Sequence, residues 1–115
     1  MGSIIHVDNS RFFRKQMKAF LNDIGFESEG FDRCNDALNA IGVGGVSYVI
    51  TGLELADMSG EEFIEKIIAI ANHIPVIVVS STEKKERADR LKTMGVEAVI
   101  GKSGNWKGEL NQLLA

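Results

Sequence analysis

Several residue types are scarce in this sequence of 115 residues, and each shortage excludes a class of protein. The only cysteine is Cys34, so the chain can form neither an intramolecular disulfide nor a cysteine-rich zinc site. No apolar run approaches the length that spans a membrane, and no signal peptide opens the chain. The formal net charge of −3 argues against a broad nucleic-acid-binding face. We therefore expect a cytoplasmic protein whose partners are neither nucleic acid nor membrane.

The overall composition is that of one globular domain. Hydrophobic residues make up 44% of the chain and charged residues 25%, which predicts an ordered core and not a disordered tail. No linker, low-complexity tract or repeat divides the sequence, so we expect one domain over residues 1–115. We interpret Cys34 as a helix residue near the surface and not as a reactive thiol, which would need a basic neighbourhood.

Strands and helices are predicted to alternate along the whole chain. Short runs rich in β-branched residues predict strands at 3–7, 26–31, 46–51, 74–80 and 96–101. Apolar residues at helical spacing, bounded by capping residues and glycines, predict helices at 10–24, 32–42, 59–72, 82–95 and 105–115. Five strand–helix units in succession predict a parallel sheet with helices on both faces.

The candidate site lies where the predicted strands end. In an open parallel sheet, ligands bind beyond the carboxyl ends of the strands. The polar residues at those ends are Asp8, Asn9, Glu54, Ser80 and Lys102. A carboxylate, a hydroxyl and an ammonium group around one oxyanion are typical of phosphoryl transfer, and Mg²⁺ would need several oxygen ligands there. The middle strand, however, delivers Gly52, which has no nucleophilic atom.

Four motifs, in order and on the expected elements, carry a resemblance to a known family. They are "IIHVDNSRFFRK", "VITGLELADMSG", "IPVIVVSS" and "VEAVIGKS". Together they resemble the receiver domain of two-component response regulators, of the chemotaxis-receiver type, over essentially the whole chain. The resemblance implies a flavodoxin-like α/β fold with five parallel strands in the order 2-1-3-4-5.

The chain departs from the family pattern mainly at the positions that carry chemistry. Gly52 stands where the family has its phospho-accepting aspartate, and Asn9 where it has the second acid of the opening pair. The remaining departures are Ala56 for a proline, Ser103 for the proline after the lysine, and Val99 for the aromatic switch residue. The retained positions are Asp8, Ser80, Lys102 and Gly60.

The resemblance and its departures together predict a degenerate receiver that is not an enzyme. The remnant phosphorylation site would be Asp8, Asn9, Glu54, Ser80 and Lys102, and the switch positions Ser80 and Val99. With Asp8 the one carboxylate left to hold a metal, we expect no cofactor and at best weak Mg²⁺ binding. We expect Asp8 and Lys102 to form an ion pair, and His6 to be a hydrogen-bonded strand histidine and not a metal ligand.

The expected partner is another protein. The resemblance implies contacts through the fourth helix, fifth strand and fifth helix, as a homodimer or against an output domain of a longer regulator. Two alternatives stay open. One is a receiver that still accepts a phosphoryl group on a nearby acid such as Glu54, with Mg²⁺. The other is a sensor that holds a small anion or nucleotide at Gly52, Asp8 and Lys102.

Overall fold

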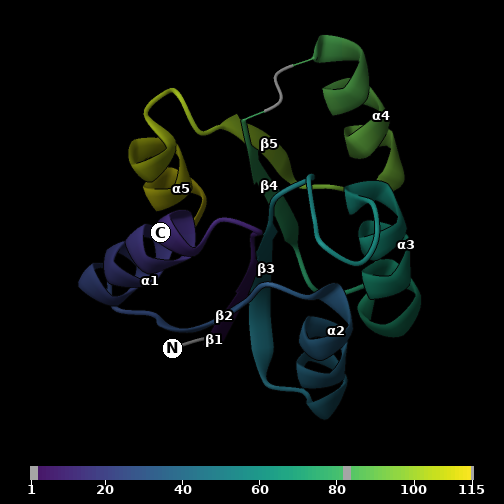
Figure 1. Ribbon diagram of the computed structural model, residues 1–115, viewed down its shortest axis with the longest axis horizontal. Helices are drawn as coiled ribbons and strands as arrows, with labels where there is room; N and C mark the ends of the chain where they lie inside the picture. The colour runs from purple at the N-terminus through teal and green to yellow at the C-terminus, as the bar shows by residue number, and fades with distance from the viewer. Residues whose placement is uncertain (1–2, 82–83, 115) are drawn as a thin grey trace.

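The computed structural model describes residues 3–81 and 84–114, in which five strands alternate with five helices. The strands are β1 (Ser3–Val7), β2 (Glu27–Phe31), β3 (Val46–Thr51), β4 (Val76–Ser80) and β5 (Ala98–Gly101). The helices are α1 (Arg11–Asp23), α2 (Cys34–Val43), α3 (Gly60–Ala71), α4 (Lys85–Met94) and α5 (Trp106–Leu114). All neighbouring strands pair in parallel in the order β2-β1-β3-β4-β5, which confirms the predicted flavodoxin-like topology (Figure 1).

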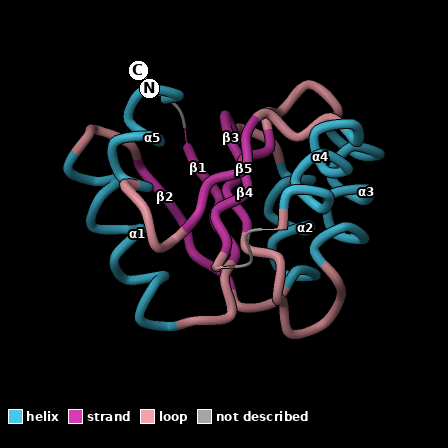
Figure 2. Tube along the Cα trace, turned by 90° about the horizontal axis from the view of Figure 1, so that it is seen from above, coloured by secondary structure: helices cyan, strands magenta, loops and turns pink. Residues whose placement is uncertain are grey.

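The sheet separates two layers of helices. Helices α1 and α5 cover one face, and α2, α3 and α4 cover the other (Figure 2). Successive side chains of a strand point to opposite faces, so Ile4 packs under α1 and α5 while Ile5 packs on the other side. Strand β4 is buried along its whole length, as expected for a strand covered on both faces. The hydrophobic clusters on the two faces of the sheet hold the parallel strands in place, so that their carboxyl ends lie along one edge.

Local capping chemistry sets the helix boundaries. Ser10 caps α1, and its Oγ accepts a hydrogen bond from the Phe13 N–H at 3.2 Å. Ser59 caps α3 in the same way and accepts from the Glu62 N–H at 3.1 Å. Helix α4 ends at Met94 and is capped by Gly95, whose φ of 113° is accessible mainly to glycine.

Most predicted boundaries are correct to within two residues. The fourth strand begins at Val76 and not at 74, because Pro75 has no N–H to donate and contributes only its carbonyl, to the Val49 N–H. The fifth strand likewise begins at Ala98. Helix α4 begins at Lys85; the first two residues predicted for it, 82 and 83, lie outside the described residues.

The surface position predicted for Cys34 is wrong. Helix α2 begins at Cys34 itself, and this first residue is turned inward and fully buried. Burial, reinforced by the neighbouring carboxylate of Asp57, raises the pKa of the thiol to about 12. The thiol therefore stays protonated at neutral pH and is a core residue.

None of the helices within residues 3–81 and 84–114 combines the length and apolar character needed to cross a lipid bilayer.

Candidate functional site

The parallel register brings four of the predicted site residues to one edge of the sheet. Gly52 follows the last residue of β3, and its N–H donates to the Val7 carbonyl at 2.9 Å. Lys102 follows the last residue of β5, and its N–H donates to the Ser80 carbonyl at 3.0 Å. Asp8 follows Val7 directly. Backbone hydrogen bonds between strand ends thus hold the rim together without help from a ligand.

Asp8 and Lys102 form the expected ion pair. Lys102 Nζ lies 2.8 Å from Asp8 Oδ2, and the Asp8 side chain is only 9% exposed. The other carboxylate oxygen, Oδ1, accepts from the Ser10 N–H at 2.8 Å. The Lys102 ammonium also lies 4.2 Å from the centre of the Phe13 ring, at cation–π distance. Both oxygens of the carboxylate and the ammonium therefore already have partners within the chain.

Gly52 is buried beside this pair. A Cβ built there would lie 3.1 Å from Asp8 Oδ2, which is a tight but not impossible approach. The positive-φ glycines of the described chain are Gly25, Gly44, Gly45 and Gly95, so Gly52 has a backbone conformation that other residues can adopt. The backbone conformation at this position therefore does not require a glycine. What distinguishes this strand end is the missing side chain.

Glu54, the alternative acceptor, points toward helix α4. Its Oε1 lies 3.3 Å from Arg87 Nη1, and its side chain is 71% exposed. The stronger partner of Arg87 is Glu61, which receives two hydrogen bonds of 2.7 and 2.8 Å. The hydrogen bond from Arg87 lowers the pKa of Glu61, and the same bond raises the pKa of Arg87. This network ties α4 to the start of α3.

Asp57, in the same loop, has a structural role that the sequence did not indicate. Its two oxygens accept from the backbone N–H groups of Cys34 at 2.8 Å and Asn35 at 3.1 Å. Desolvation opposes the charged form, but these hydrogen bonds outweigh it and lower the pKa of Asp57. Asp57 thus caps α2 from 23 residues away, a contact that no local pattern in the sequence could reveal.

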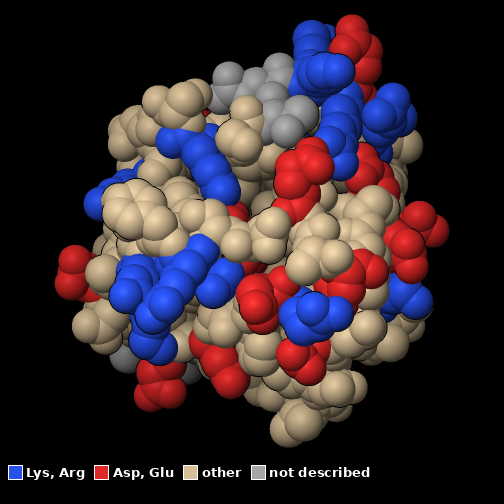
Figure 3. Space-filling view, in the orientation of Figure 1, with Lys and Arg blue, Asp and Glu red and all other residues tan. Residues whose placement is uncertain are grey.

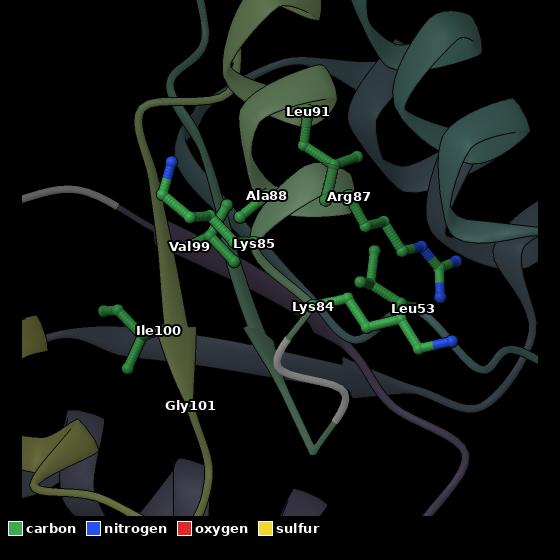
Figure 4. Close-up of a pocket in the computed structure, with 9 residues that line it drawn as sticks. All are labelled: Leu53, Lys84, Lys85, Arg87, Ala88, Leu91, Val99, Ile100 and Gly101. Carbon is green, nitrogen blue, oxygen red and sulfur yellow. The ribbon is translucent and has the colours of Figure 1, made fainter.

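Of the two predicted switch positions, Val99 lines a cleft between α4 and β5. Ser80 is buried at the end of β4, and Val99 is partly buried and pairs with Val78 in the register of β4 and β5. The cleft has a volume of about 250 Å³. Its lining residues are Leu53, Lys84, Lys85, Arg87, Ala88, Leu91, Val99, Ile100 and Gly101 (Figure 4). The cleft next to Val99 therefore combines apolar side chains with the cationic side chains of Lys84, Lys85 and Arg87 on the α4 side.

His6 differs from the prediction. It is buried, with 2% of its surface exposed, but neither ring nitrogen has a hydrogen-bond partner among the described residues. The ring packs against Gly30 of the neighbouring strand, where an added Cβ would come within 2.6 Å of Cε1. Desolvation, with a smaller effect of Lys18, lowers the pKa of His6 to about 4, so the ring is neutral at pH 7. A glycine at the paired position of β2 was the one sequence signal of this contact.

Within the described residues, no three His, Cys, Asp or Glu side chains lie together in a way that could hold a metal ion. Asn9 is exposed at the rim and adds an amide in place of a carboxylate. Asp8 is therefore the one predicted metal ligand, and it is engaged by Lys102.

Known proteins agree with this architecture. A response regulator receiver domain protein from Methanospirillum hungatei JF-1 superposes with a TM-score of 0.90 at 23% identity, over 99% of this chain and 91% of that one. A response regulator receiver protein from Pseudomonas putida gives a TM-score of 0.89 at 24% identity, over 98% and 94%. The chemotaxis protein CheY4 of Vibrio cholerae gives 0.88 at 22% identity, over 99% and 97%. At these identities, the likeness shows the fold alone.

The sequence itself identifies the family. The sequence model of the response regulator receiver domain matches residues 4–114, which includes every strand and helix apart from the first residue of β1. The motifs noted above fall at the carboxyl ends of β1, β3, β4 and β5, where the rim lies. The chain therefore belongs to the response regulator receiver domain family of two-component signalling proteins.

Proposed function

We propose that this receiver domain signals through protein contacts without being phosphorylated on an aspartate. The observation that carries the proposal is Gly52 at the end of β3, next to Asp8, where the family pattern has its acceptor aspartate. A phosphoryl group needs a nucleophilic oxygen in line with the phosphorus, and a glycine offers none. The domain would thus be a regulatory module and not an enzyme, acting in the cytoplasm.

The ion pair at the rim supports the same proposal. In a phosphorylatable site, a carboxylate would hold Mg²⁺ while a lysine neutralised the phosphoryl oxygens. Here Asp8 and Lys102 neutralise each other at 2.8 Å, and Asn9 adds no charge. Binding a metal would require breaking that pair and would gain only one carboxylate ligand. We infer that the domain works without Mg²⁺ or another cofactor.

The proposed contact surface is the face formed by α4, β5 and α5. Arg87 holds α4 against Glu61 and Glu54, which gives this helix a defined position without a phosphorylation signal. Between α4 and β5, the cleft beside Val99 leaves apolar side chains available to a partner (Figure 4). The partner would be an output domain, a separate protein or a second copy of the chain, and neither nucleic acid nor membrane.

Trp106 offers a direct test at the rim. Its ring lies 4.9 Å from that of Phe13, which in turn contacts the Lys102 ammonium at 4.2 Å, so its fluorescence should respond when Lys102 moves. We expect no change in fluorescence and no added phosphoryl group in the intact mass after incubation with Mg²⁺ and acetyl phosphate, or with beryllofluoride. A stoichiometric phosphoryl adduct in the wild type would overturn the proposal.

The variant Glu54→Gln identifies the source of any such adduct. If the adduct disappears in this variant, Glu54 is the acceptor and the alternative of a rescued phosphorylation site is correct. A fluorescence response to phosphate or a nucleotide without Mg²⁺ would instead favour an anion sensor at Gly52, Asp8 and Lys102. Neither response is expected, because the anion would compete with Asp8 for Lys102.

A further inference from the structure

Helix α1 has a charge opposite to that of the rest of the chain. It contains four cations, Arg11, Arg14, Lys15 and Lys18, and a single acid, Asp23. Because α1 carries +3 and the whole chain carries −3, the other residues together carry −6. In Figure 3, basic side chains gather over α1, whereas acidic ones predominate on the side of α2 and α3.

This charge pattern does not stabilise the helix. Arg14 and Lys15 each lie three or four residues from both Arg11 and Lys18, so these pairs are neighbours on the helix surface and repel one another. Arg11 occupies the first turn, which contains no acid and where the helix dipole disfavours positive charge. Arg14 has a structural role, because its Nη1 donates to the Asp8 carbonyl at 2.7 Å. Arg11 and Lys15 are exposed, and no such role accounts for them.

An open groove runs beside these cations. It lies between α1 and the edge strand β2 and has a volume of about 650 Å³. Lys15, Lys18 and Ala19 line it on the helix side, and Phe26 and Ser28 on the other side. Lys18 Nζ donates to the Ser28 carbonyl at 3.1 Å, so its ammonium is fixed over the groove.

An exposed aromatic residue lies on the same helix. Phe12 is 71% exposed, the most exposed aromatic side chain in the described part of the chain. It precedes Lys15 by three residues and Ala19 by seven, which places it on the same side of the helix as these two groove-lining residues, beyond the end of the groove. The surface thus combines cations, a groove and a large apolar group.

We propose that Arg11, Phe12, Lys15, Lys18 and the groove beside them bind a short acidic segment of a protein partner that also carries a large apolar side chain. The cations would pair with its carboxylates, and Phe12 would pack against the apolar group. A nucleic acid or an anionic membrane fits less well, because Glu27 lines the same groove and the rest of the chain is strongly negative. This surface lies on the opposite side of the sheet from α4, and its binding does not require phosphorylation (Figure 2).

A labelled peptide provides the test. We would titrate the full chain with a fluorescein-labelled peptide of aspartate and glutamate residues around one tryptophan, and follow amide shifts in parallel. Saturable binding is expected, with shifts confined to α1 and β2. The double variant Arg11→Glu with Lys15→Glu should weaken binding by at least about tenfold, and Phe12→Ala by about threefold. The matched double variant Arg33→Glu with Lys66→Glu, at exposed positions just before α2 and within α3, should change it less than about twofold.

Several results would overturn the proposal. One is an equal loss of binding in both double variants, which would indicate a response to net charge alone. Another is a set of shifts that maps to α4 and β5. The third is tighter binding to single-stranded oligouridine or to phosphatidylserine vesicles than to the peptide. The last is a dimer in sedimentation experiments that the Arg11→Glu, Lys15→Glu variant abolishes, which would make a second copy the occupant. Unfolding curves of all variants would be recorded first, to establish that each variant is folded before its binding is compared.

Discussion

The two faces of the sheet are built from different side chains. Under α1 and α5, the core contains Phe13 and Trp106, with Phe20, Phe26 and Tyr48 packed at its border. Under α2, α3 and α4 it is almost entirely aliphatic, and Phe63 is its one fully buried aromatic residue. The first face also contains the unpaired His6 and the Lys102–Phe13–Trp106 contacts that reach the rim.

This difference in composition suggests that the two faces of the sheet have different roles. The aliphatic face anchors the sheet and holds α4 through the Arg87–Glu61 pair. The aromatic face tolerates polar and cationic groups, because rings can accommodate an ammonium and leave room for an imidazole. Perturbations of the aliphatic face should therefore appear mainly as loss of stability, and those of the aromatic face also as changes in pH response and fluorescence.

Truncation of Phe63 should have the largest effect. Phe63 is completely buried between α3 and the sheet, so Phe63→Ala should lower the free energy of unfolding by about 4 kcal/mol. Phe13→Ala, on the other face, should cost less, about 3 kcal/mol, because Phe13 is 8% exposed beside the rim. Urea unfolding with unchanged m-values checks both. Equal costs would contradict the proposed difference between the faces.

The next largest effect should come from His6 and pH. Its folded pKa of about 4 lies below the usual 6.5, so the unfolded chain binds the proton first as the pH falls. Stability should therefore decrease from pH 6.5 down to about 4, by about 3 kcal/mol in total, and change little from this source at lower pH. Urea unfolding at a series of pH values measures the slope.

The variant His6→Leu provides the control for that slope. Carboxylates such as Asp57 and Glu61 have lowered pKa values and also lose their stabilising charge in acid, so the wild-type curve contains several contributions. Subtracting the His6→Leu curve removes the carboxylate contributions and leaves the contribution of His6 to the free energy of unfolding. A wild-type curve parallel to that of the variant between pH 6.5 and 4 would show that His6 is solvated or hydrogen-bonded in solution.

Local patterns in the sequence predicted the elements of the fold but not the contacts between distant residues. The alternation of strands and helices follows from local patterns, whereas the strand order followed from the family resemblance; the structure confirms both. The cap supplied by Asp57 depends on a contact between residues 23 positions apart, and the burial of Cys34 depends on its packing in a core formed by several elements. Periodicity reports which face of an element is apolar, but it does not report which distant polar group lies opposite. Contacts between a loop and a distant helix, such as that of Asp57 with the start of α2, become visible only in the three-dimensional structure.

A smaller effect is expected at the pair that holds α4. Arg87 and Glu61 are about three-quarters buried and make two short hydrogen bonds, so a double-mutant cycle with Arg87→Gln and Glu61→Gln should give a coupling of about 1 kcal/mol. The matched pair Lys85–Asp89, with side chains 88% and 61% exposed, should give less than about 0.5 kcal/mol. If the two couplings were equal, α4 would not be held in place by this network.

The most direct test of the rim is Gly52→Asp compared with Gly52→Asn. Either side chain must pass 3.1 Å from Asp8 Oδ2, so both share the steric cost, and only the aspartate adds a like charge. Without Mg²⁺, the aspartate variant should be less stable than the asparagine variant by about 1 kcal/mol, because two carboxylates would then adjoin a single Lys102.

Mg²⁺ should raise the melting temperature of the aspartate variant alone, since it binds a pair of carboxylates and relieves their repulsion. The absence of any Mg²⁺ response would mean that a second aspartate beside Asp8 does not suffice to form a metal site while Asn9 and Ala56 are in place. A Mg²⁺ response of the wild type would show that Asp8 prefers the metal to Lys102, and the rim would then resemble an intact receiver more closely than its ion pair indicates.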